Sequence, residues 1–104
     1  MYQVVLSTCP TTEVAEQLAS QLVTEKLAAC VNILPKIKSI YQWQGKIVQD
    51  QEVQLLIKTD SELFQALCDK INQLHPYDVP EIIALEITQS SHAYLQWIDE
   101  SLTK

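Results

Sequence analysis

Residues 28–58 read AACVNILPKIKSIYQWQGKIVQDQEVQLLIK, and they predict two long antiparallel strands joined by a tight turn. Side chains alternate between apolar and polar after Pro35, which is typical of a strand, and Pro35 itself indicates a bulge or an edge position. Gly45 is the single glycine of the chain, and it lies where a hairpin turn needs a positive φ angle. The return strand then runs over residues 46–58.

This hairpin is long for so small a chain. Residues 28–43 would extend over roughly 50 Å at about 3.3 Å per residue. A domain of about 100 residues has a diameter of roughly 35 Å, so the hairpin would project beyond it. Ile40, Tyr41 and Trp43 would lie on the projection without cover. We therefore expect the protein to form oligomers in which a neighbour covers these side chains.

The remaining segments place strands and helices on either side of the hairpin. We expect a first strand over Gln3–Leu6, a helix opened by Thr11 or Thr12, a second helix opened by Asp60 or Ser61, a fourth strand over Glu81–Thr88 and a last helix opened by Ser90 or Ser91. The order βαββαβ plus a C-terminal helix predicts an α+β, ferredoxin-like fold with a long protruding hairpin. Residues 1–104 would form a single domain.

Composition excludes several classes of protein. The seven basic residues are scattered and the net charge is −6, which argues against nucleic-acid binding because phosphate contacts need a clustered cationic face. No apolar run approaches the roughly 20 residues that span a bilayer, so we expect no membrane partner. The first ten residues contain no secretory leader, and three unpaired cysteines fit a reducing compartment. We therefore expect a cytoplasmic protein.

Motifs for catalysis are missing as well. One glycine is too few for a P-loop or a dinucleotide fingerprint, because both motifs need several glycines to bring backbone amides onto phosphate. His75 and His92 are the only histidines, and no nucleophile elbow accompanies them. We therefore expect that the protein is not an enzyme.

The segment from His75 to Glu81 gathers polar side chains of a kind that bind cations. It brings His75, Tyr77, Asp78 and Glu81 within seven residues of one another. One interpretation is a helix end, with a histidine at the C-terminus followed by a proline stop. The other is one side of a site for a borderline or hard divalent cation, with imidazole and carboxylate oxygens as ligands and Cys9 as a candidate soft ligand. An isolated cysteine is otherwise a small buried hydrophobe.

The return strand over residues 46–58 carries two further candidate site residues. Glu52 and Lys58 are separated by six residues, so a regular strand would point both to one face. They are either charges on a solvent face or part of a polar cleft between subunits, together with Trp43, Tyr77 and Glu81. Trp43 is otherwise explained by packing.

Six stretches of the chain resemble the CutA divalent-cation-tolerance family in order and spacing. They are Ala28 to Ile33, Ser39 to Lys46, Glu52 to Gln54, Lys58-Thr59, His75 to Ile82 and Tyr94 to Trp97. The most specific parts are His75-Pro76-Tyr77-Asp78-Val79-Pro80-Glu81-Ile82 and Tyr41-Gln42-Trp43-Gln44-Gly45.

The resemblance implies a ferredoxin-like subunit in a tight homotrimer and a role in tolerance to divalent metals, copper above all. It also implies copper ligands at a cysteine of the first strand and at two adjacent histidines before the Pro-Tyr. Here the second histidine corresponds to His75, Leu74 replaces the first, and Ser7 stands at the cysteine position, two residues before Cys9. Two other functions remain open, namely binding of a small signalling ligand between subunits and service as a scaffold for partner proteins.

Overall fold

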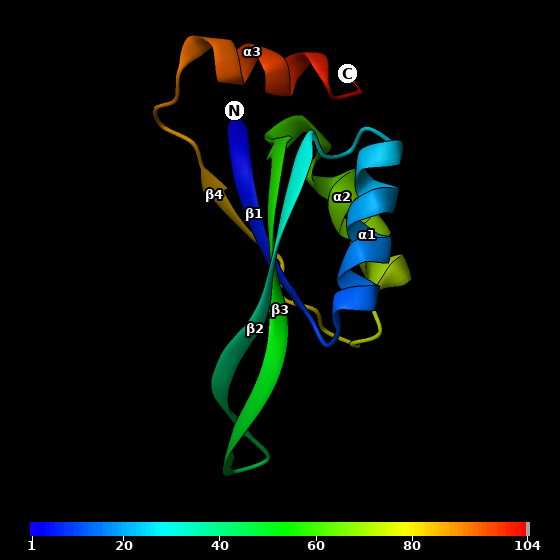
Figure 1. Ribbon diagram of the computed structural model, residues 1–104, viewed down its shortest axis with the longest axis vertical. Helices are drawn as coiled ribbons and strands as arrows, with labels where there is room; N and C mark the ends of the chain where they lie inside the picture. The colour runs from blue at the N-terminus through cyan, green and yellow to red at the C-terminus, as the bar shows by residue number, and fades with distance from the viewer. Residues whose placement is uncertain (104) are drawn as a thin grey trace.

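Four antiparallel strands form one sheet in the computed structural model, which describes residues 1–103 (Figure 1). Across the sheet the strands follow the order β2-β3-β1-β4, with β3 and β1 at the centre. The strands are β1 (Tyr2–Cys9), β2 (Cys30–Trp43), β3 (Lys46–Asp60) and β4 (Ile83–Glu86). The helices are α1 (Thr12–Thr24), α2 (Phe64–Leu74) and α3 (His92–Glu100). This order and topology confirm the predicted ferredoxin-like fold.

Several boundaries differ from those predicted. Strand β1 continues to Cys9 because each of its residues pairs with β3, up to the pair Cys9 and Val53. Strand β4 is shorter than predicted, since only four of its residues pair with β1. The second helix begins at Phe64, after a 3₁₀ turn over Ser61–Leu63. Asp60 caps that turn by accepting the Glu62 N–H.

The core lies between the sheet and the two helices α1 and α2, which cover one face of it (Figure 1). Alternate residues of the central strands point into this core, as a two-residue period requires. The fully buried side chains there include Val5, Leu18, Leu22, Leu55, Ile57, Leu67 and Ile71. Burial of one such side chain contributes about 1.5–3 kcal/mol to folding. Helix α1 is held at its start by Thr11, whose hydroxyl accepts the Val14 N–H.

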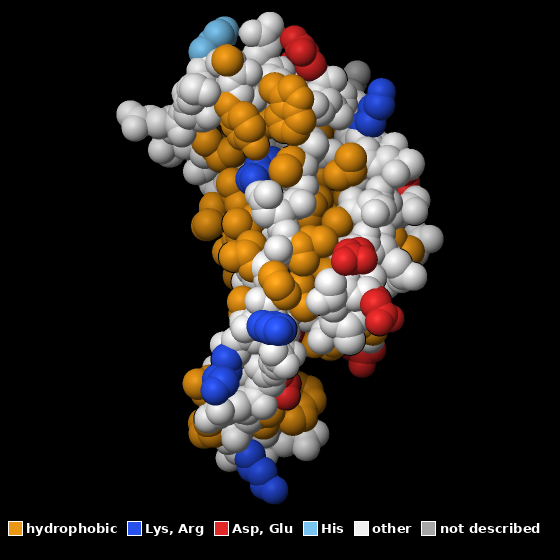
Figure 2. Space-filling view, in the orientation of Figure 1, with side chains coloured by type: hydrophobic (Ala, Val, Ile, Leu, Met, Phe, Trp, Pro, Cys, Tyr) orange, Lys and Arg blue, Asp and Glu red, His pale blue; other side chains and the backbone are white. Residues whose placement is uncertain are grey.

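The other face of the sheet has no such cover over most of its area. Val4, Leu6, Leu56, Ile83 and Leu85 are cross-strand neighbours on this side, which we call the open sheet face. Ile83 and Leu85 are 49% and 50% exposed. In Figure 2, hydrophobic side chains gather over β1 and β4 on the side of the sheet away from α1 and α2. The open sheet face is therefore an apolar surface that a single chain leaves exposed.

Helix α3 lies across one end of the sheet instead of along its open face (Figure 1). Ser91 caps it by accepting the Tyr94 N–H. Its buried residue Ile98, together with Leu102 just after the helix, packs with Ala29 in a small second cluster. The helix therefore seals the end of the sheet that is opposite the hairpin.

The hairpin of β2 and β3 projects from the domain, as predicted (Figure 1). The molecule measures 45 × 26 × 21 Å along its principal axes. The register of β2 against β3 shifts between Leu34 and Ile37, which confirms the bulge predicted at Pro35. Lys36 takes a left-handed φ of 61° at this point. Beyond the bulge the hairpin has no helix beside it.

The hairpin turn provides a direct test of this geometry. Gln44 and Gly45 have φ angles of 49° and +79°, as a two-residue primed turn requires. No atom lies within 4 Å of a Cβ added at Gly45. Gly45→Ala should therefore lower the free energy of unfolding by about 1 kcal/mol through backbone strain alone. Urea unfolding at constant protein concentration would measure this, with Gln44→Asn as a control that should retain full stability. Equal stability of Gly45→Ala and the parent would contradict the turn.

Candidate functional site

His75 is buried where the end of α2 meets the end of β1, with 7% of its surface exposed. Its Nε2 lies 2.6 Å from the carbonyl oxygen of Thr8. A carbonyl oxygen only accepts hydrogen bonds, so Nε2 carries the proton and donates. The other ring nitrogen, Nδ1, accepts the backbone N–H of Tyr77 at 3.1 Å. Both nitrogens of the imidazole are therefore engaged by the backbone.

These two hydrogen bonds give His75 a structural role. They join the loop after α2 to β1, and the backbone N–H of His75 also caps α2 by donating to Ile71. The helix-end interpretation is thus what the geometry favours. A metal ion could bind Nδ1 only after displacing the Tyr77 N–H, which would leave a backbone donor without a partner. The geometry does not favour His75 as a metal ligand in this conformation.

Cys9 lies near this histidine at the end of β1, and it is fully buried in the main core. Burial, followed by the negative charge of Glu52, raises the pKa of its thiol to about 11. Metal ions bind the thiolate form of cysteine, which is scarce at neutral pH when the pKa is so high. Cys9 is therefore a protonated packing residue of the core in this structure.

The resemblance implies a cysteine ligand at the position where this chain has Ser7. Ser7 is fully buried, and its Oγ has no hydrogen-bond partner among residues 1–103. No three His, Cys, Asp or Glu side chains within those residues converge as a metal would require. Residues 1–103 of a single chain therefore do not form a thiolate and imidazole copper site.

A polar cluster does form at the base of the hairpin. The phenol of Tyr77 donates a hydrogen bond to Glu52 at 3.0 Å, and the phenol of Tyr41 donates one to Asp50. Burial, the hydrogen bond to Glu52 and the charges of both carboxylates raise the pKa of Tyr77 to about 12. The phenol therefore stays protonated at neutral pH and remains a donor. We call Tyr41, Asp50, Glu52 and Tyr77 the phenol–carboxylate cluster.

Two of the four residues of this cluster, Glu52 and Tyr77, were predicted from the sequence as site residues. Asp50 and Tyr41 were not. Asp50 carries a usable signal, because it lies two residues before Glu52 and thus on the same face of β3. Tyr41 could be found only from the strand register, which places it opposite Val48 and diagonal to Asp50.

The other predicted cleft residues lie apart in a single chain. Trp43 is at the hairpin tip, opposite Lys46, and is 62% exposed. Lys58 is further along β3, opposite Val4 and Cys30. Glu81 is exposed in the segment before β4. A single chain therefore brings together only Glu52 and Tyr77 of the five, and a cleft between copies of the chain remains a prediction.

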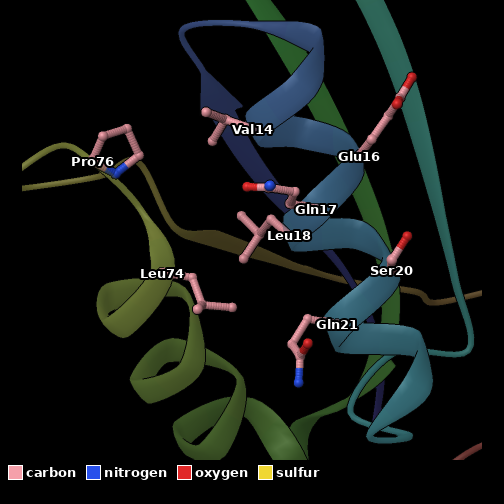
Figure 3. Close-up of a pocket in the computed structure, with 8 residues that line it drawn as sticks. All are labelled: Val14, Glu16, Gln17, Leu18, Ser20, Gln21, Leu74 and Pro76. Carbon is pink, nitrogen blue, oxygen red and sulfur yellow. The ribbon is translucent and has the colours of Figure 1, made fainter.

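A groove of about 630 Å³ lies elsewhere, between α1 and α2 (Figure 3). Apolar and uncharged polar side chains make up most of its wall, including Val14, Gln17, Leu18, Gln21 and Leu74. Glu16 is the single charged residue that lines it. The groove lacks the convergent titratable groups that mark catalytic sites, so the phenol–carboxylate cluster is the better candidate for function.

Fold and site together define a ferredoxin-like α+β domain with a projecting hairpin and a polar cluster at its base. A family model described as CutA1 divalent ion tolerance protein matches residues 3–101. The chain belongs to this family, which is defined by ion tolerance and is not a known enzyme family.

Relatives from distant organisms show the same similarity. The divalent-cation tolerance protein CutA of Thermus thermophilus is 52% identical over 101 residues, covering 97% of this chain and 98% of its own. Human protein CutA is 50% identical over 88% of this chain, which spans only 51% of the human protein.

Solved structures agree with the sequence comparison. The Cut A1 structure from Thermus thermophilus superposes with a TM-score of 0.97 at 50% identity, covering 99% of this chain and 100% of that one. CutA1 from Oryza sativa gives a TM-score of 0.97 at 45% identity, covering 99% of this chain and 94% of that one.

The state of Cys9 can be tested by alkylation. Because burial raises the pKa of the Cys9 thiol to about 11, its thiolate should be far scarcer at pH 8 than that of an exposed thiol. Mass spectrometry after iodoacetamide treatment of the folded protein should find Cys9 unmodified. Cys68, which is only partly buried, should react faster. Rapid modification of Cys9 under native conditions would contradict its burial and would make it a candidate metal ligand again.

Proposed function

We propose that this protein acts in divalent-cation tolerance, copper included, as a cytosolic homotrimer without enzymatic activity. The observation that carries the proposal is the open sheet face, together with the hairpin that extends beyond the domain. The bacterial relatives are named for tolerance to divalent cations. The number of three subunits follows from the family resemblance.

The hairpin tip supports self-association through its exposed apolar side chains. Ile40, Trp43 and Ile47 are 62%, 62% and 71% exposed. Single exposed apolar residues are ordinary, but a cluster at the end of a projection adds to the apolar area of the open sheet face. Each square ångström of such surface removed from water contributes about 25 cal/mol to association. A second copy of the chain offers surfaces of matching kind.

Charge distribution supports the same conclusion. Strands β2 and β3 carry Lys36, Lys38, Lys46 and Lys58 against Asp50, Glu52 and Asp60, although the whole chain has a net charge of −6. The hairpin is therefore basic, and the remainder of each subunit is acidic. Opposite charges on two parts of one chain favour contact between the hairpin of one copy and the body of another.

The cytosolic location rests on cysteine chemistry. Cys9, Cys30 and Cys68 are free thiols. Free cysteines are usual in reducing compartments. No helix within residues 1–103 is long and apolar enough to cross a membrane.

Assembly through the open sheet face can be tested by a charged substitution. Static light scattering should give about three times the chain mass of 11.8 kDa for the parent. Leu85→Asp should shift the protein toward monomer, because it places a carboxylate in the face that a neighbour covers. Val79→Asp is the matched control, since Val79 is 88% exposed in a loop and its substitution should leave the mass unchanged. A monomeric parent would overturn the proposal.

Metal binding gives a second test. Because both nitrogens of His75 are engaged and Cys9 is buried, we propose that copper binds weakly and without a dedicated imidazole ligand. Competition against a chromophoric chelator should show similar, weak copper affinity for the parent and for His75→Gln. His92→Gln is the control, since His92 is exposed on α3. A loss of affinity specific to His75→Gln would restore His75 as the copper ligand.

A further inference from the structure

The loop between α2 and β4, residues 75–82, is tied to two strands by side chains at its start, and we call it the α2–β4 loop. The Nε2–H of His75 donates to the carbonyl oxygen of Thr8 near the end of β1. The phenol of Tyr77 donates to the Glu52 carboxylate of β3, 3.0 Å away, at the base of the hairpin. In Figure 1 the loop passes below α1 toward the point where the hairpin leaves the domain. The loop therefore connects β1 with β3.

One hydrogen bond couples these two connections. The Nδ1 of His75 accepts the backbone N–H of Tyr77 at 3.1 Å. The two rings also contact each other, with 4.7 Å between their centroids and 53° between their planes. The backbone of Tyr77, and with it the reach of its phenol to Glu52, is therefore positioned by a histidine that accepts a hydrogen bond at Nδ1.

Only a neutral imidazole can make both hydrogen bonds of His75. Because Nε2 carries the proton, Nδ1 accepts with its lone pair. A second proton would place an N–H on Nδ1, facing the N–H of Tyr77, and two donors cannot pair. The side chain of His75 is buried, so water is not at hand to accept from either donor. A charged imidazole is therefore incompatible with the observed conformation of the loop.

We propose that the α2–β4 loop is a proton-sensitive connection, closed while His75 is neutral and opened when its ring takes up a second proton. Opening moves the Tyr77 backbone away from Nδ1 and its phenol away from Glu52, so the base of the hairpin is released from the loop. Histidine suits this role because an ordinary imidazole titrates at about pH 6.5. The inference concerns a single chain and does not depend on the proposed function.

Other titratable side chains lie on the elements around the ring. They are Cys9 on β1, Glu52 on β3, Tyr77 and Asp78 in the loop, and Glu16 on α1, which lines a groove with Pro76. The last turn of α2, residues 71–74, has no charged side chain. The raised pKa values of Cys9, about 11, and Tyr77, about 12, keep both groups protonated at neutral pH. The carboxylates favour a charged imidazole, whereas burial and the bond to the Tyr77 N–H oppose it.

NMR of the full chain can follow the ring and the loop together. His92→Gln leaves His75 as the only histidine, and buffer with EDTA keeps metal ions from competing with protons. Between about pH 8 and about pH 5, the imidazole resonances should change from the Nε2–H tautomer to the charged ring. The backbone amide resonance of Tyr77 should move in the same step. A ring that stays neutral throughout, or a ring that titrates while the Tyr77 amide does not move, overturns the proposal.

Urea unfolding at constant protein concentration gives an independent measurement. The unfolded chain takes up a proton on this histidine at about pH 6.5 and the closed loop does not, so stability is complete above this pH and is lost below it. The unfolding equilibrium constant per chain should rise about 10-fold from this source between pH 7.5 and pH 5.5. His75→Gln should lose this rise, because its amide can donate to the Thr8 carbonyl and takes up no proton.

Matched variants separate His75 from its neighbours. Glu52→Gln keeps an oxygen that can accept from Tyr77, and His92→Gln changes an exposed residue of α3, so both should show the same rise as the parent. His75→Asn is the second test variant, because its amide oxygen can accept the Tyr77 N–H without titrating. The ratio of two constants within one variant is compared, so a variant of lower stability is still informative. A parental rise in both His75 variants overturns the proposal.

Discussion

The two-residue period of β3 is the constraint on which the rest of the molecule depends. Held between β2 and β1, this strand points Val53, Leu55 and Ile57 toward the helices. The residues between them face the opposite side. A slip of one residue in register would exchange the two sets and bury charges in the core. The pairs of β3 with β1, such as Ile57 with Val5, therefore fix the core and the polar sites at once.

Much of the fold was accessible from sequence because its signals are local. Alternation along β2 and β3 predicted the hairpin, and Pro35 and Gly45 correctly located its bulge and its turn. Element ends were harder. The length of β1 is set by pairing with β3, and the shortness of β4 by pairing with β1, so neither is determined by residues within the strand itself.

The candidate site shows a different limit. Residue types could suggest His75 as a metal ligand, but its role depends on the Thr8 carbonyl, which is distant in sequence and contributes no side-chain signal. Burial likewise decides the chemistry of Cys9, through contacts across the core. Glu52 and Tyr77 could be predicted from the sequence because the residue types alone specify a carboxylate and a phenol. Their meeting required a loop and a strand to come together in space.

The projecting hairpin also bears on how a newly made chain behaves while it is alone. Beyond the bulge, the paired residues of β2 and β3 are close in sequence, from Ile37 with Glu52 to Trp43 with Lys46, so this part has a short loop to close and should form early in folding. Beyond the bulge, however, no helix of residues 1–103 covers the two paired strands (Figure 1). An isolated subunit would thus exchange amide hydrogens fastest there and be cut there first by proteases. If copies of the chain associate as proposed, the lifetime of the chain in a cell is set by the encounter between them, and chains without a partner are removed first.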